Sequence, residues 1–320
     1  MKTLIVSAAK AGHVNQCLAF CERAGWSADQ IVQIVSPGRM TPPLKRVGLK
    51  LMRRIDTWRA TPAAREAGLL RIVASGAAAE RVVAAYRSRY GDDLFAAFSG
   101  RPLWRAPIFD VALVPRHSLK PGEQETGFGL PAARRSILRR GVPARRAPAP
   151  SAAPRGVFAM IGGVNKAFEI DPDRIVGQIE RLLENGAPPP FTVAFSRRTP
   201  ERTESRLRAA LGDRVAFVDR RDRSGFETAL VGAEEYVVTP DSLTMLCEAC
   251  DTGKPVRVFD LVCFDPASTT ARCVQDLIDG GEVALAPDGE PTPPPAGRFE
   301  VSGAAVEIYR QWEAQRLQAA

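Results

Sequence analysis

Short runs rich in valine, isoleucine and phenylalanine alternate along the chain with segments of helical periodicity, and each run ends in small or turn-forming residues. This alternation is typical of parallel sheets with helices on both faces, because parallel strands need a long crossover connection between them. It predicts an α/β fold with strands at the following positions: 3–7, 30–35, 70–74, 111–114, 157–163, 191–196, 215–218, 235–239 and 256–259.

The length of 320 residues favours two domains, because a single hydrophobic core stops growing at roughly 250 to 300 residues. Residues 134–155 are rich in arginine, alanine and proline, which predicts an extended and solvated linker. We therefore expect two Rossmann-like lobes, 1–133 and 156–320, whose parallel sheets face a central cleft. The apolar spacing over 304–320 predicts a helix that closes the second lobe.

The composition is that of a globular protein, with 45% hydrophobic and 25% charged residues, and no apolar run reaches the ~18 residues of a membrane span. No secretory cleavage pattern follows Met1, so we expect a cytoplasmic protein. The six cysteines lack the pattern of a secreted scaffold, and we expect free thiols and no metal site. A net charge of +8 favours an anionic partner: a nucleic acid, a membrane surface or a phosphorylated substrate.

The two histidines, His13 and His117, both fall just after predicted strands of the first lobe. Ligands of open parallel sheets bind beyond the carboxyl ends of the strands, so both side chains are candidates for a site there. A neutral imidazole can accept a proton from an attacking hydroxyl, which makes His13, in the small-residue turn after Gly12, a candidate general base. The alternative is that each imidazole only caps a turn.

Two segments of the second lobe predict a phosphate site. Gly162 and Gly163 form a turn that lets the backbone approach a ligand, and Asn165 follows it. The next strand ends in hydroxyls, two guanidinium groups and the start of a helix: Ser196, Arg197, Arg198 and Thr199. Arginine matches phosphate oxygens, and a helix start adds about half a positive charge. The alternative is a solvated turn in which Thr199 caps the helix.

A third segment, from Thr239 to Glu248, places a strand directly before a helix. We expect Ser242 and the first-turn amides of that helix to hold a diphosphate. Glu248 lies two turns further along, on a helix face shared with Asp241 and Met245, where its carboxylate can accept hydrogen bonds from ribose hydroxyls. The alternative is that Glu248 pairs with a cation on the surface.

As an ordered set, these motifs resemble the mitochondrial-fission Elm (elongated-mitochondria) family, with this chain as a bacterial-type member. The positions that carry the resemblance are Pro115 and His117, Ile161–Gly163, Ser196–Pro200, Thr239–Ala249 and Gly253–Val256. A weaker similarity extends to GT-B glycosyltransferases. The turn 11–14 looks like the Gly-His turn of the lipid-linked muramyl-peptide N-acetylglucosaminyl transferase, although that turn is richer in glycine. Ser118 stands where the family usually has an acidic residue.

The resemblance implies a GT-B-like, metal-independent glycosyltransferase that binds no permanent cofactor. Its donor would be a nucleoside-diphosphate sugar, and its acceptor would be lipid-linked or a polysaccharide. Because a plant member of the family recruits a dynamin-related partner at the mitochondrial surface, the first alternative is a non-catalytic membrane-surface scaffold. The second alternative, a nucleic-acid-binding protein, ranks last because no recognition motif accompanies the basic residues.

Residues 44–59 predict a basic amphipathic helix, because apolar residues at helical spacing are flanked by lysines and arginines. This pattern is typical of a helix that lies on an anionic membrane, which would place the protein at the inner face of the plasma membrane. The alternative is that the apolar stripe packs on the first lobe. The stripe consists of Leu44, Val47, Leu51, Ile55 and Trp58.

Overall fold

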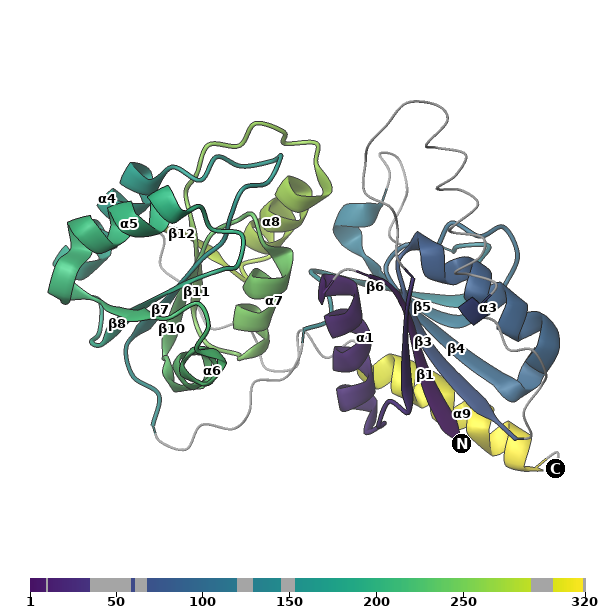
Figure 1. Cartoon of the computed structure of the whole chain (residues 1–320). Coiled ribbons are helices and arrows are strands. Elements are labelled where there is room, and N and C mark those ends of the chain that lie inside the picture. The colour runs from purple at the N-terminus through teal and green to yellow at the C-terminus, as the bar shows by residue number, and fades with distance from the viewer. Residues whose placement is uncertain are drawn as a thin grey trace. The chain divides into compact units, whose positions relative to one another are not determined.

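The computed structural model describes residues 1–9, 11–34, 59–60, 68–119, 129–144, 153–288 and 302–318. The chain divides into two compact units: unit 1 comprises Met1–Arg145 with Glu300–Ala320, and unit 2 comprises Arg146–Phe299. Each unit is built on a six-stranded sheet (Figure 1). All neighbouring strands are parallel, which confirms the predicted α/β fold with two Rossmann-like lobes.

Unit 1 has the strand order β2-β1-β3-β4-β5-β6. The side chains of its four central strands are nearly all buried on both faces, as expected when helices cover a parallel sheet on both sides, whereas those of the two edge strands are more exposed. Helices α1 and α9 pack on one face, and α3 packs on the other (Figure 1). The elements are β1 (Lys2–Ala8), α1 (Ala11–Ala24), β2 (Gln30–Ile34), β3 (Leu70–Ser75), α3 (Ala77–Tyr90), β4 (Leu94–Ser99), β5 (Phe109–Pro115), β6 (Ala133–Arg139) and α9 (Ser302–Gln318).

Unit 2 has the strand order β12-β11-β10-β7-β8-β9, which is the 3-2-1-4-5-6 order of dinucleotide-binding sheets counted from β7. Helices α4 and α5 pack on one face, whereas α6, α7 and α8 pack on the other. The elements are β7 (Val157–Ile161), α4 (Pro172–Glu184), β8 (Phe191–Phe195), α5 (Glu201–Leu211), β9 (Ala216–Val218), α6 (Arg223–Gly232), β10 (Glu235–Val238), α7 (Leu243–Asp251), β11 (Val256–Phe259), α8 (Thr269–Asp279) and β12 (Ala284–Ala286).

The predicted closing helix exists as α9, but it belongs to unit 1 and not to the second lobe. Tyr309 and Trp312 are buried against Phe95, with ring centroids 5.1 and 5.6 Å away. The Arg71 guanidinium lies 5.5 Å from the centre of the Tyr309 ring. The helical spacing of the apolar residues predicted which side chains share one face of α9. That face covers the aromatic surface of unit 1 around Phe95.

The predicted linker 134–155 is also shorter than expected, because its first part forms β6. Among the described residues this strand pairs with β5 alone, at the edge of the sheet, so Arg134 and Arg135 on it extend into solvent, whereas Arg139 is buried. Arg134 is half exposed and forms ion pairs with Asp92 and Asp110. The two units divide between residues 145 and 146.

Candidate functional site

The candidate site lies where the order of the unit 2 sheet reverses, between β7 and β10. Strands on either side of such a point send their following loops in opposite directions, which leaves a crevice at the carboxyl edge of the sheet. The turn Gly162-Gly163 follows β7, and Thr239 and Asp241 follow β10. The structure therefore brings together two segments that the sequence predicted separately.

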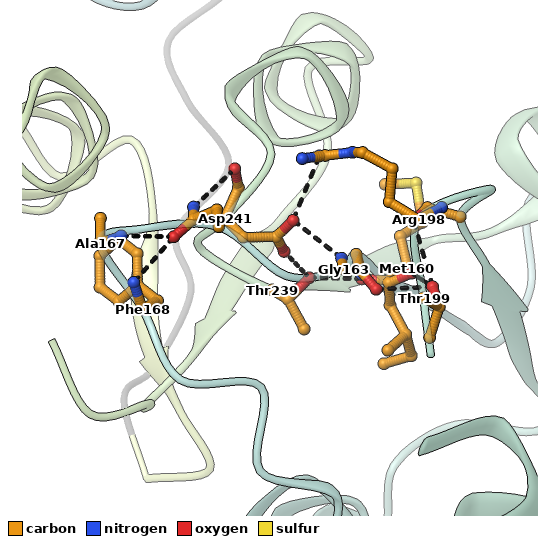
Figure 2. Close-up of polar contacts among 12 residues, drawn as sticks. Met160, Gly163, Ala167, Phe168, Arg198, Thr199, Thr239 and Asp241 are labelled. Atoms are coloured by element: carbon orange, nitrogen blue, oxygen red, sulfur yellow. Dashed lines mark hydrogen bonds and ion pairs between the residues drawn. The ribbon is translucent and has the colours of Figure 1, made fainter. Parts of the chain in front are cut away.

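The Gly162-Gly163 turn is hydrogen-bonded to the segment after β10 (Figure 2). The Gly162 amide donates to the Thr239 hydroxyl at 2.7 Å, and the Gly163 amide donates to Oδ2 of Asp241 at 2.9 Å. The Thr239 hydroxyl in turn donates to Oδ1 of Asp241 at 2.7 Å. We expected these amides to face a ligand, and instead they donate to side chains of the protein.

Thr199 attaches the segment after β8 to the same turn. Its side chain is buried, and its hydroxyl lies 2.6 Å from the Gly162 carbonyl and 3.1 Å from the Ser196 hydroxyl. Helix α5 has Pro200 as its N-cap, so the alternative that Thr199 caps this helix is wrong. Thr199 instead fixes the backbone that carries Arg198, whose amide donates to the Ser196 hydroxyl.

Arg198 and Asp241 form an ion pair across the site, with 3.3 Å between Nη2 and Oδ2. The Asp241 side chain is fully buried, whereas that of Arg198 is 53% exposed. Burial raises the pKa of the Asp241 carboxyl, and the hydrogen bonds from Thr239 and Gly163 and the charge of Arg198 act in the opposite direction. A guanidinium has five N–H donors, so Arg198 keeps donors that can face solvent or a ligand. Arg197 beside it is exposed.

Helix α7 begins immediately after this ion pair. Its N-cap, Ser242, makes no side-chain capping hydrogen bond. The first amides of a helix have no acceptor within the helix, so this first turn offers donors and the positive end of the helix dipole. Residues 242–245 are half-buried, and Met245 packs against the core on this face of the sheet. Glu248 is half-buried on α7.

Asn165 has a structural role in this site that its sequence position did not reveal. Its side-chain amide donates to the Asp241 carbonyl at 3.1 Å, and its Oδ1 accepts from the amides of Ala167 and Phe168 (Figure 2). Both ends of the side chain are therefore used to fold the loop after β7 against the segment after β10.

The structure places the two histidines of unit 1 differently. His13 is half-buried on α1, one residue after Gly12, and its Nδ1 lies 2.9 Å from the Ser75 hydroxyl. His117 is buried in a short 3-10 helix, Arg116–Ser118, that follows β5. Strands β3 and β4 lie between β1 and β5, so the histidines follow strands that are not neighbours in the sheet.

Residues 11–316 match the model of the family described as mitochondrial fission ELM1. The chain belongs to this family. The resemblance carried by the glycine turn, the arginine segment and the helix at Asp241 is thereby confirmed.

An uncharacterised protein of Rickettsia prowazekii (strain Madrid E), RP120, is 29% identical to this ELM1-family chain over 107 residues. The match covers 31% of this chain and 30% of that relative, so it spans less than a third of the relative's length.

Several solved structures are similar to this ELM1-family chain in fold. The UDP-GlcNAc 2-epimerase from Neisseria meningitidis bound to UDP-GlcNAc is 11% identical, with a TM-score of 0.48 over 97% of this chain and 100% of that one. The heptosyltransferase WaaC of E. coli with ADP is 12% identical, with a TM-score of 0.45 over 98% and 100%. MurG of Acinetobacter baumannii is 12% identical, with a TM-score of 0.45 over 89% and 86%.

The residues around His13 were not predicted from the sequence. Ser75 ends β3, Ser99 ends β4, and Gln16 lies one turn along α1 from His13, and together these side chains form a hydrogen-bonded group. The serines that end the buried strands β3 and β4 were the available signal. The basic segment 44–59 lies outside the described residues except for Arg59. In the described part of the chain, no helix is long and apolar enough to cross a membrane.

Proposed function

We propose that unit 2 of this ELM1-family protein binds the diphosphate of a nucleotide-sugar at the first turn of α7, and that the protein transfers the sugar to an acceptor. The observation that supports this most directly is the uncapped start of α7 beside Arg198, at the point where the strand order reverses. Helix amides and a guanidinium are the groups that recognise phosphate most often.

Asp241 gives Arg198 a fixed position in this proposal. The buried carboxylate is itself held by the Gly163 amide and the Thr239 hydroxyl, so it forms a rigid anchor for the guanidinium. Arg198 then offsets the charge of Asp241 and presents its other donors to the diphosphate. Arg197, which is exposed, supplies a second positive charge.

The proposed reaction needs no metal ion, because positive charge comes from the arginines and the helix start. The acceptor hydroxyl attacks the anomeric carbon, the bond from that carbon to the diphosphate oxygen breaks, and the bonding electrons leave with the diphosphate. His13 takes the proton of the attacking hydroxyl. Arg197, Arg198 and the α7 amides stabilise the charge that develops on the leaving group, and Glu248 binds the ribose.

The charge pattern of the sequence supports a proposal for the acceptor and the location. Docking of the basic segment 44–59 on the anionic inner face of the plasma membrane would bring the protein close to a lipid-linked or polysaccharide acceptor. We propose this location for the protein, with cytoplasmic exposure of both units.

A non-catalytic scaffold of the fission type is the second candidate function. It is favoured by one observation, the use of both glycine amides by Thr239 and Asp241. In a scaffold, this hydrogen-bonded group would only stabilise unit 2.

A thermal-shift screen of nucleoside diphosphates and their sugar conjugates separates the two candidates. A ligand at 100 times its dissociation constant raises the free energy of unfolding by about 2.7 kcal/mol. We expect the melting temperature to rise with the nucleotides of one nucleobase. This rise should be lost in Arg198→Ala and kept in Arg206→Ala. Arg206 is a matched control because it is 49% exposed and pairs with the exposed Asp173 on the same unit. No shift with any nucleotide would favour the scaffold.

A further inference from the structure

Three serines form a row across the carboxyl end of the unit 1 sheet. Ser7 of β1 pairs in register with Ser75 of β3, which pairs with Ser99 of β4. Paired residues of parallel strands project from the same face, so the three side chains point to one side of the sheet. All three are buried, and the apolar residues nearest to them in the same strands pack against α1 on that face.

Ser75 connects this row to His13. Its hydroxyl lies 2.9 Å from the Ser99 carbonyl oxygen and 2.9 Å from Nδ1 of His13. A carbonyl oxygen can only accept, and a hydroxyl has a single proton. The Ser75 proton is therefore used toward Ser99, and Ser75 can only accept a hydrogen bond from His13. The Gln16 side-chain oxygen, 3.4 Å away, is a further atom that can only accept from Ser75, and it leads to the same result.

We infer that Ser75 is a positioning residue that fixes the tautomer of His13, with the proton on Nδ1 and the lone pair on Nε2. The inference depends on the Ser75 hydroxyl, whose single proton is donated to the backbone carbonyl of Ser99. This carbonyl is present whichever side chain occupies position 99. Gly76 lies beside the ring, because a Cβ added at this glycine would be 3.7 Å from Cδ2 of His13.

The tautomer decides which atom of His13 can act as a base. In the neutral imidazole only the nitrogen without hydrogen accepts a proton, so this arrangement assigns that function to Nε2. The use of Nε2 on an acceptor hydroxyl rests on the proposed function, whereas the tautomer itself rests only on the contacts within unit 1.

Long-range proton–nitrogen NMR of the ¹⁵N-labelled protein tests the inference without any substrate. The chain has only two histidines, and the signals that disappear in His13→Asn identify those of His13. At a pH where both rings are neutral, we expect a protonated-type Nδ1 and an unprotonated-type Nε2. In Ser75→Ala the preference for protonated Nδ1 should be lost, and Nε2 should become the mainly protonated nitrogen.

Ser99→Ala is the matched control, because it removes the Ser99 hydroxyl bonded to Gln16 but keeps the carbonyl that accepts from Ser75. The tautomer should survive in this variant. Protonated Nε2 in the wild-type protein would overturn the inference even if Ser75→Ala failed to fold, as would an unchanged tautomer in a folded Ser75→Ala. If the tautomer is as expected and no nucleotide binds, the proposed function fails and the inference stands.

Discussion

Asp241 lies so close to Gly162 that a Cβ placed on this glycine would be 1.9 Å from Oδ1 of the carboxylate. Gly163 is constrained in the same way by the backbone of Arg198, at 2.1 Å. The glycine pair therefore allows the segments after β8 and β10 to approach the turn after β7. This close approach, rather than access for a ligand, is what the two glycines provide.

Gly162→Ala should destabilise the protein by about 1 to 3 kcal/mol, the usual cost of overpacking a buried site, because Asp241 is fixed by its hydrogen bonds and cannot turn away freely. Urea denaturation measures the change. Gly177→Ala on α4 is the control, since a Cβ there meets nothing within 4 Å. We expect no loss of stability from the control, and equal stability of the two variants would contradict the packing argument.

Asp241→Asn should change how stability depends on pH. Burial raises the pKa of Asp241 above its ordinary value of 3.8, so the folded protein binds this proton more tightly than the unfolded chain. The stabilisation that protonation provides is complete below pH 3.8 and is lost as pH rises through the folded pKa. The unfolding free energy of wild type minus that of the variant should therefore fall above about pH 4. A difference independent of pH would refute this.

Glu248→Ala should weaken nucleotide binding by about 1.5 to 3 kcal/mol, the range for hydrogen bonds to a charged group, without unfolding the protein. Titration calorimetry with the nucleotide found in the screen measures the affinity. Glu201→Ala is the control, because Glu201 is exposed on helix α5, which packs on the other face of the unit 2 sheet. Unchanged affinity in Glu248→Ala would remove this residue from the proposed site.

Trp312→Ala should cost about 3 to 5 kcal/mol of stability, as expected for a large aromatic side chain removed from a core. Trp312 is 8% exposed, packs on Phe95 and donates its indole N–H to the Asp92 carbonyl. Denaturation followed by circular dichroism measures the loss. Leu317→Ala on the same helix should change stability by less than about 0.5 kcal/mol, because Leu317 is 68% exposed. Similar values for both variants would show that α9 is not anchored by Trp312.

Much of the fold could be predicted from the sequence, because parallel strands buried on both faces appear as continuous apolar runs. The strand Leu94–Ser99 was not predicted, since its central alanines weaken the β-type signal, and β6 was hidden by arginines that an edge strand tolerates. The helix 302–318 was predicted as a helix but assigned to the wrong lobe, because helical spacing does not identify the surface that a helix covers.

The sequence predicted which residues gather at the candidate site, but it did not predict the hydrogen bonds between them. Residues that follow strands must gather at the carboxyl edge of a parallel sheet, so Gly162, Arg198 and Asp241 could be found from their positions. The partner of an amide could not, because the Gly163 amide and the Asp241 carboxylate are 78 residues apart in the chain. His13 was selected as a candidate in the same way and stays a prediction, while its contact with Ser75 depended on strand register, which no local pattern specifies.

The return of α9 to unit 1 has a consequence for synthesis on the ribosome. Unit 1 is formed by two separate segments of the chain, and the whole of unit 2 is translated between them. At about 5 to 20 residues per second, translation of unit 2 takes roughly 8 to 30 s. During this time the aromatic surface around Phe95 is not covered by Tyr309 and Trp312. The first segment of unit 1 therefore exposes an apolar face of its finished sheet during that interval, and unit 2 can complete its fold before α9 covers that face.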